Sequence, residues 1–237
     1  MADTETLDDL VRRVDPDRWQ ASRFIGDPAA RADVIALYAL NYELARVAGG
    51  VSNALMGEIR LTWWREAIEE IAAGKAPRKH PNVEALAASG FDPSALALLA
   101  DALFVDLDEG PLKDEAAVLA YIDGTAGALA VLAARRLDSR ADPHAVKGAA
   151  RAWGLAGLWR LKQAGRSRLP EDWTQEQVKQ RVQTQLRTAR GEVKRLPVAA
   201  FPAVAPAALA RAYVSGREIG ELEKKARLTF SVATGRL

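Results

Sequence analysis

The segment DPAARADVIALYALNYELARVA, residues 27–48, shows how this chain folds. Its apolar residues recur at three- and four-residue spacing, which places them together on an α-helix, and no β-branched run of strand length interrupts them. Asp27 stands directly before Pro28, so a capping carboxylate precedes a proline at the first helical position. The segment therefore predicts a helix that begins at Pro28. The same Asp-Pro pair recurs at residues 15–16, 92–93 and 142–143.

The helical spacing continues over nearly all of the 237 residues, so we predict an all-α protein. Two stretches are expected to be loops: residues 74–81, which combine Gly, Pro and charge, and residues 196–206, whose three prolines exclude a continuous α-helix. Neither loop is long enough to separate domains, so one domain over residues 1–237 is expected, with the residues after about 230 loosely held. The expected helices are 4–14, 16–25, 28–48, 53–73, 82–89, 93–108, 114–138, 143–163, 174–195, 206–214 and 215–230.

The composition excludes several classes of protein. The chain has no cysteine, which rules out disulfides, thiolate nucleophiles, zinc–thiolate sites and iron–sulfur sites. His80 and His144 are its two histidines, and neither has the surroundings of a metal ligand. No uninterrupted apolar run reaches the roughly 18 residues of a membrane span, and the acidic start MADTETLDDLVRRV is unlike a signal peptide. We therefore expect a cytoplasmic protein without a spanning helix.

Charge is unevenly distributed along the chain. Residues 1–146 carry 15 basic and 24 acidic side chains, whereas residues 147–237 carry 18 basic and 7 acidic ones. A basic half can pair with the acidic half of the same fold or contact an anionic membrane surface from one side. No nucleic-acid-binding motif accompanies it, so nucleic acid is not an expected partner.

Four strings resemble the squalene/phytoene synthase family. They are ALYALNYELARVAGG at 36–50, GEIRLTWWREAI at 57–68, Tyr121 followed by Ala-Gly at 126–127, and GRSRLP at 165–170. The last two are similar to the family's Y-x4-AG segment and GR-x-YLP turn, and all four occur in the family's order. The resemblance implies the all-α isoprenoid-synthase fold, with helices around a central apolar cavity.

The resemblance fails at the residues that carry the family's chemistry. In that family two aspartate motifs bind magnesium ions, which neutralise a prenyl diphosphate as pyrophosphate leaves. Here residues 45–49, Ala-Arg-Val-Ala-Gly, replace the first motif, and Leu161 follows Arg160 where the second motif has an aspartate. Magnesium needs oxygen ligands, which these side chains do not supply. We therefore expect no catalytic residue, no metal site and no cofactor.

Without these aspartates the strings are more similar to a non-catalytic branch of the family, which includes a mitochondrial assembly factor for respiratory complex I. The string VAAFPA at 198–203 supports that likeness. It implies an inactive protein that helps to assemble a membrane respiratory complex, NADH dehydrogenase, by binding a protein subunit or a lipid at the inner face of the membrane. Two alternatives remain open. One is a magnesium-dependent prenyl diphosphate transferase with relocated acids such as Asp106, Asp108 or Asp123, and the other is an isoprenoid or quinone carrier without chemistry.

The candidate residues for binding a ligand or partner lie on these strings or in the basic half. Each also has a structural interpretation: aromatic residues pack in cores, Glu43 and Arg46 have i, i+3 spacing, and cations suit helix C-termini. An anion site for lipid head groups or a diphosphate is the functional interpretation of the cluster that includes Lys162. Lys224, Lys225 and Arg227 would add attraction to anionic lipids. The candidates are Tyr38, Glu43, Arg46, Glu58, Arg60, Trp63, Arg65, Tyr121, Arg160, Arg166 and Arg168.

Overall fold

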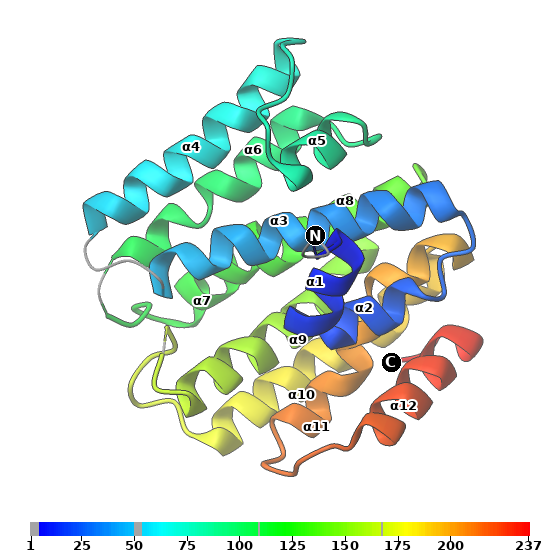
Figure 1. Ribbon diagram of the computed structural model, residues 1–237. Helices are drawn as coiled ribbons and strands as arrows, with labels where there is room; N and C mark the ends of the chain where they lie inside the picture. The colour runs from blue at the N-terminus through cyan, green and yellow to red at the C-terminus, as the bar shows by residue number, and fades with distance from the viewer. Residues whose placement is uncertain (1–4, 50–53, 109, 167) are drawn as a thin grey trace. The chain divides into compact units, whose positions relative to one another are not determined.

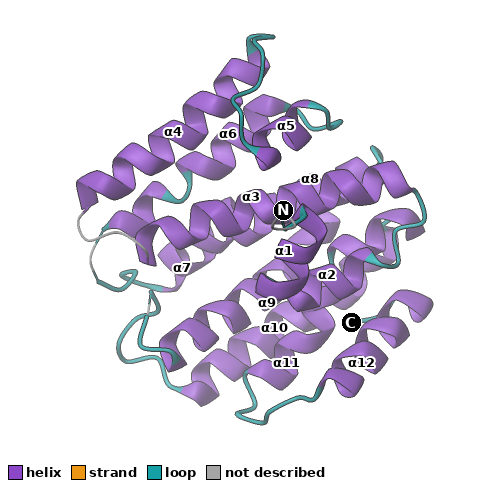
Figure 2. Ribbon diagram, viewed as in Figure 1, coloured by secondary structure: helices purple, strands orange, loops and turns teal. Residues whose placement is uncertain are grey.

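The computed structural model describes residues 5–49, 54–108, 110–166 and 168–237. Within these ranges the regular structure is helical and no residue lies in a strand (Figures 1 and 2), which confirms the all-α class. The chain divides into two compact units, residues 1–109 and residues 110–237. Each unit has its own hydrophobic core, and the grouping of both into one domain stays a prediction.

The first unit is organised around α3 (Pro28–Gly49), which packs against α1, α2, α4 and α5. All residues from 34 to 40 are buried, so α3 is surrounded by protein along this stretch. α4 packs mainly on α6. The bounds of the other helices are α1 (Leu7–Val14), α2 (Pro16–Ser22), α4 (Ala54–Ala72), α5 (Pro81–Ala87), α6 (Pro93–Asp101) and the 3₁₀ helix Phe104–Leu107.

The second unit is organised around α9 (Pro143–Gln163), which packs against α7, α8, α10 and α11. Figure 1 shows α9 and α10 running side by side. The other α-helices are α7 (Glu115–Ile122), α8 (Ala128–Leu137), α10 (Gln175–Glu192), α11 (Ala210–Tyr213) and α12 (Glu221–Thr234). A π turn, Asp123–Gly127, joins α7 to α8, and the 3₁₀ helices are Val193–Arg195, Val198–Ala203 and Ala205–Leu209.

All four Asp-Pro pairs begin helices, as predicted. In each pair the aspartate carboxylate accepts a hydrogen bond from a backbone N–H two or three residues later, over 2.9–3.2 Å. These bonds satisfy donors that have no partner within the helix. One more cap was not expected: Nδ1 of His80 accepts from the N–H of Asn82 at 3.2 Å and begins α5.

Three expectations about the backbone are wrong in detail. The helix expected over 93–108 stops at Asp101, and a 3₁₀ helix follows it. The loop expected over 196–206 is largely formed by two 3₁₀ helices, which tolerate the prolines because their short turns require few consecutive i→i+3 bonds. The segment expected to be loose after 230 remains in α12 until Thr234, where Gly235 at φ 64° ends the helix.

The helical stretch Glu115–Leu137 is long and apolar enough, by length and composition alone, to span a membrane. It includes the π turn, and Asp123 in that turn forms ion pairs with cations of α9. The stretch also packs on α9 along both α7 and α8. These contacts attach the stretch to the rest of the second unit, and 33% of its 18-residue apolar window is buried.

Gly148 sets the spacing between α9 and α10. A Cβ at this position would lie 3.0 Å from the backbone nitrogen of Ala189 and 2.7 Å from Oε2 of Glu192. On the same helix, a Cβ at Gly157 would meet nothing within 4 Å. The two glycines therefore provide a matched pair of sites for testing this helix packing.

We predict that Gly148→Ala lowers the free energy of unfolding by about 1–3 kcal/mol, because the backbone of α10 must move to admit the methyl group. Gly157→Ala should instead raise it by up to about 1 kcal/mol, since alanine favours the helix. Urea unfolding followed by circular dichroism measures both. Equal effects of the two substitutions would contradict the close approach at Gly148.

Candidate functional site

Tyr38 lies in the core of the first unit. Its side chain is 3% exposed, and burial raises the pKa of its hydroxyl to about 12. The guanidinium of Arg18 lies 5.6 Å from the centre of its ring. These contacts favour the interpretation of Tyr38 as a residue packed in the core over its interpretation as a residue that binds a ligand.

Glu43 and Arg46 form the expected i, i+3 pair on α3. Nη2 of Arg46 lies 2.7 Å from Oε2 of Glu43, and the Arg46 guanidinium also lies 5.6 Å from the ring of Tyr42. The sequence resemblance puts the family's first aspartate motif at residues 45–49, so on that resemblance a paired guanidinium lies where metal-binding carboxylates would be. Gly50, which ends the first string, and residues 51–53 lie outside the described residues.

On α4, Arg65 turns toward α6. It lies 3.7 Å from both Glu69 and Asp101, and 5.9 Å from the ring of Phe104. Glu58 and Arg60 are exposed. Glu58 and Arg60 therefore do not belong to an interior polar network with Arg65, and binding of a partner's charges by these residues stays a prediction.

The two tryptophans of α4 belong to an aromatic cluster. Trp63 and Trp64 meet edge to face at 5.1 Å, and the ring of His80 lies 5.8 Å from Trp63 and 4.9 Å from Trp64. Arg78 stacks over Trp63 at 5.2 Å and forms ion pairs with two glutamates of α4. This cluster holds the 73–80 connection against α4, a role for His80 that its loop position in the sequence did not indicate.

In the second unit, Tyr121 precedes the π turn, and its carbonyl accepts a hydrogen bond from the Thr125 hydroxyl at 2.7 Å. Asp123 accepts two hydrogen bonds from Arg151, at 2.7 and 2.6 Å, and lies 3.2 Å from Nζ of Lys147. Burial would raise the pKa of Asp123, but these two cations outweigh burial and hold the pKa below its ordinary value of 3.8. Asp123 therefore forms an ion pair that joins the π turn to α9.

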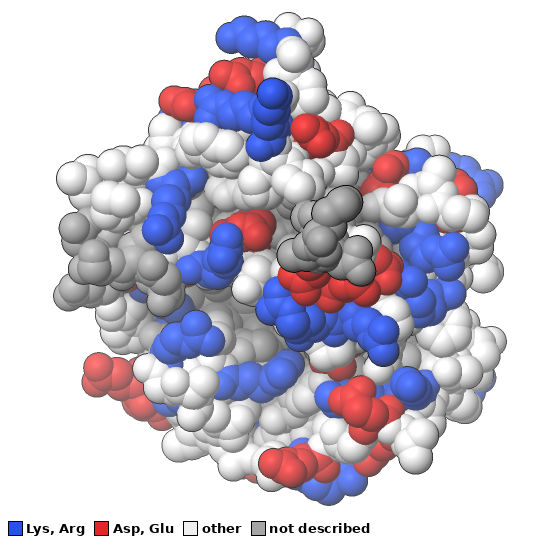
Figure 3. Space-filling view, viewed as in Figure 1, with Lys and Arg blue, Asp and Glu red and all other residues white. Residues whose placement is uncertain are grey.

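Ion pairs also join the acidic and basic parts of the chain. Asp123 pairs with Arg151, and Glu115 of α7 lies 3.0 Å from Nε of Arg181 on α10. On the face shown in Figure 3, basic and acidic side chains lie beside one another. Some of the charge asymmetry is therefore neutralised inside the second unit.

Lys162, at the position of the second motif, is engaged with backbone. Its Nζ donates to the carbonyls of Pro170, Glu171 and Trp173 over 2.9–3.1 Å. The ammonium group of Lys162 thereby stabilises the turn that leads from α9 to α10. Leu161 beside it has no ligand atom, so this segment supplies no carboxylate for magnesium.

The other cations of this region have different neighbours. Arg160 stacks over the ring of Tyr213 at 4.4 Å, and Nη1 of Arg168 donates to the carbonyl of Gly110 at 2.7 Å. Arg166 is exposed. The structure thus places these arginines on separate contacts, and a shared anion site for them stays a prediction.

Within the described ranges, no group of three or more His, Asp or Glu residues is arranged to hold a metal ion. Asp106 and Asp108, which sequence reasoning named as substitutes, lie at the end of the first unit, and Asp123 is paired with Arg151. Both Asp106 and Asp108 take part in further interactions. The expected absence of a metal and the alternative of a relocated magnesium site both stay predictions.

The squalene/phytoene synthase family model matches residues 11–185, well over half of the chain. The chain therefore belongs to the squalene/phytoene synthase family. Eleven chains of solved structures match it, among them a dehydrosqualene synthase crystallised with a ligand, at a TM-score of 0.76 and 12% identity. That match covers 97% of this chain and 94% of the other, and at this identity it shows the fold alone. No curated protein sequence matches the chain.

We predict that Asp123→Asn lowers the free energy of unfolding at pH 7 by about 1–2 kcal/mol, because Arg151 and Lys147 lose their counter-ion. Asp172→Asn, at an exposed position, is the control and should change it little. Urea unfolding of both variants measures this difference.

The same ion pair predicts a pH dependence. The folded pKa of Asp123 is depressed, so its contribution is complete above the unfolded value near 3.8 and is lost as the pH falls through the lower folded pKa. The stability difference between wild type and Asp123→Asn should stay constant from pH 7 to about pH 5 and shrink below about pH 4. A difference that vanished near neutral pH would be inconsistent with this assignment.

Lys162→Met should destabilise the second unit by about 1–3 kcal/mol, since three carbonyls lose a charged donor. Amide hydrogen exchange of residues 170–175 should rise in the same variant. Lys179→Met, which removes an exposed ion pair with Glu176 on α10, is the control. Unchanged exchange at 170–175 would show that Lys162 does not close this turn.

Proposed function

We propose that this protein is a catalytically inactive member of the squalene/phytoene synthase family that acts in assembly of a membrane respiratory complex, NADH dehydrogenase. The observation that supports this proposal most directly is the Glu43–Arg46 ion pair on α3, at the position that the resemblance gives to the family's first aspartate motif. A guanidinium repels magnesium, and its pairing with Glu43 occupies the nearest carboxylate there. Prenyl diphosphate ionisation needs that metal to stabilise the departing charge.

The second motif position supports the same proposal. Lys162 carries a positive charge whose three hydrogen bonds go to backbone carbonyls, and Leu161 supplies no oxygen. Converting this segment into a metal site would require both a new carboxylate and a new way to close the turn after α9. A structural role has therefore replaced the chemical one at this position.

An assembly role requires a surface for a partner, and the first turns of α4 present one. Leu55, Met56 and Ile59 are 64%, 41% and 53% exposed; Ile59 lies in the string at 57–68 that resembles the non-catalytic branch, and the other two directly precede that string. Exposed large apolar side chains grouped on one helix are typical of interaction sites. We propose that they contact a protein subunit of the membrane complex, with the protein in the cytoplasm at the inner face of the membrane.

Activity is tested by incubating the purified chain with farnesyl or geranylgeranyl diphosphate and magnesium, with an active family enzyme assayed in parallel. We expect no pyrophosphate release above that of heat-denatured protein. Release that disappears on chelation would contradict the proposal and favour relocated acids. Native mass spectra that show a stoichiometric isoprenoid or quinone would favour a carrier.

The assembly role is tested by deleting the gene in its host and measuring NADH:quinone oxidoreductase activity of isolated membranes, together with the assembled complex on native gels. We expect both to fall and to be restored by the wild-type gene. Ile59→Lys should fail to restore them, whereas Leu98→Lys, at a 67% exposed position on α6, should succeed. Undiminished complex in the deletion strain would refute the role.

A further inference from the structure

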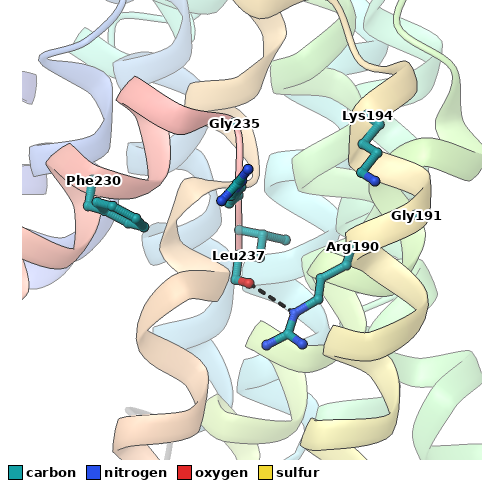
Figure 4. Close-up of a pocket in the computed structure, with 7 residues that line it drawn as sticks. Arg190, Gly191, Lys194, Phe230, Gly235 and Leu237 are labelled. Atoms are coloured by element: carbon teal, nitrogen blue, oxygen red, sulfur yellow. Dashed lines mark hydrogen bonds between the residues drawn. The ribbon is translucent and has the colours of Figure 1, made fainter.

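A pocket of about 490 Å³ lies in the second unit between the last turns of α10 and the end of α12. Figure 4 shows Arg190 and Lys194 on one wall, Phe230 of α12 on the other, and the segment 235–237 between them. The fold positions this segment: the Ser231 hydroxyl donates to the carbonyl of Arg236 at 2.6 Å, and the Arg236 N–H donates to the Ser231 carbonyl at 3.2 Å. The pocket wall is thus tied to a buried serine of α12.

The pocket is cationic. Its seven lining residues include Arg190, Lys194 and Arg236 and no acidic side chain. Within the described part of the chain, no acidic side chain forms an ion pair with any of these three. Nε of Arg190 donates to the carbonyl oxygen of Leu237 at 3.3 Å. An anion entering here would therefore meet three cations that no carboxylate side chain neutralises.

Two basic side chains of α12 near the pocket differ from these three, because each is paired with an acidic side chain. Lys224 lies 2.7 Å from Glu221, and Arg227 lies 2.8 Å from Glu223, so two of the three basic residues expected to attract lipids are neutralised on their own helix. Lys225 remains exposed. Lys224 and Arg227 thus have carboxylate side chains as partners, which Arg190, Lys194 and Arg236 lack among the described residues.

The pocket also has an apolar side. Phe230 is 62% exposed, which is unusual for a phenylalanine unless something covers it. A second hollow of about 170 Å³ shares Arg190 and Leu237 with the pocket; Leu186, Ala207 and Ala208 form its apolar part, and Arg211 and Arg227 also line it. A ligand with an anionic head and a hydrocarbon part would match both regions.

Another exposed apolar side chain lies on the same face of α12. Leu222 is 84% exposed and precedes Phe230 by eight residues, and the exposed Ala226 lies halfway between them. Residues four apart share one face of a helix, so the three form an apolar stripe that leads to the pocket. Such a stripe next to cations is the arrangement that inserts shallowly among lipid head groups.

We propose that this pocket binds a phosphate ester that carries an acyl chain. Arg190, Lys194 and Arg236 hold the phosphate, for which guanidinium groups are well suited, and Phe230 contacts the chain. A phospholipid in a membrane and a soluble phosphate ester with an acyl chain share this chemistry. The proposal does not depend on the assembly role, because it concerns α10 and α12 and neither motif position.

Calorimetric titration of the full chain with dihexanoyl phosphatidic acid, below its micelle concentration, tests the site. Inorganic phosphate is titrated in parallel and should bind at least tenfold more weakly, because it lacks the apolar contact. Arg190→Gln and Lys194→Gln should each weaken lipid binding about tenfold, the value of one charge-assisted contact. Phe230→Ser should weaken lipid binding and leave phosphate binding unchanged.

Arg195→Gln is the matched control, because Arg195 is the exposed neighbour of Lys194 and does not line the pocket. It should change affinity less than twofold. Equal losses for Arg195→Gln and Lys194→Gln would overturn the site in favour of general charge attraction, and so would lipid binding no tighter than phosphate binding. Unchanged thermal unfolding of the variants excludes a folding defect.

Sedimentation with vesicles distinguishes the two sources of the ligand, a membrane phospholipid and a soluble phosphate ester. If the ligand is a membrane lipid, the chain should sediment with phosphatidylcholine vesicles that contain 30% phosphatidic acid and not with pure phosphatidylcholine, and Arg190→Gln should reduce this. If monomeric lipid binds and vesicles do not, the ligand is a soluble phosphate ester with an acyl chain. Absence of binding in both arms would refute the proposal.

Discussion

The close packing of α9 against α10 is the constraint on which the second unit depends. Gly148 lets the two helices approach until a Cβ would reach the backbone of Ala189, and its N–H donates to Glu192 at 3.2 Å. α9 then carries Arg151, which holds the π turn through Asp123, and Lys162, which closes the turn to α10. A wider spacing would shift all of these contacts, since protein interiors are close-packed.

The departures from the family's chemistry have become structural contacts. Arg46 pairs with Glu43, and Lys162 holds three carbonyls, so neither position is an empty remnant of a metal site. A fold can be retained while its site changes, because the core of each unit depends on α3 and α9 and not on the residues at the motif positions. This explains how the chain keeps a TM-score of 0.76 to a dehydrosqualene synthase at 12% identity.

The charges of the basic half are distributed between two roles. Arg151 and Arg181 pair with acids of the π turn and α7, whereas Arg190, Lys194 and Arg236 surround a pocket without an acidic side chain. Buried or half-buried pairs hold helices together, while unneutralised cations around a hollow attract anions. A count of basic residues along the chain does not separate these roles, since the two groups are interleaved in sequence.

Local signals in the sequence determined the helical class and the four Asp-Pro helix starts. These follow from periodicity, capping chemistry and residue identity, which act over a few residues. Only the tertiary structure decided that Asp123 meets Arg151, that His80 joins two tryptophans, and that residues 190–194 and 230–237 enclose a pocket. Each of these depends on which helices pack together and at what rotation, and helical periodicity specifies neither.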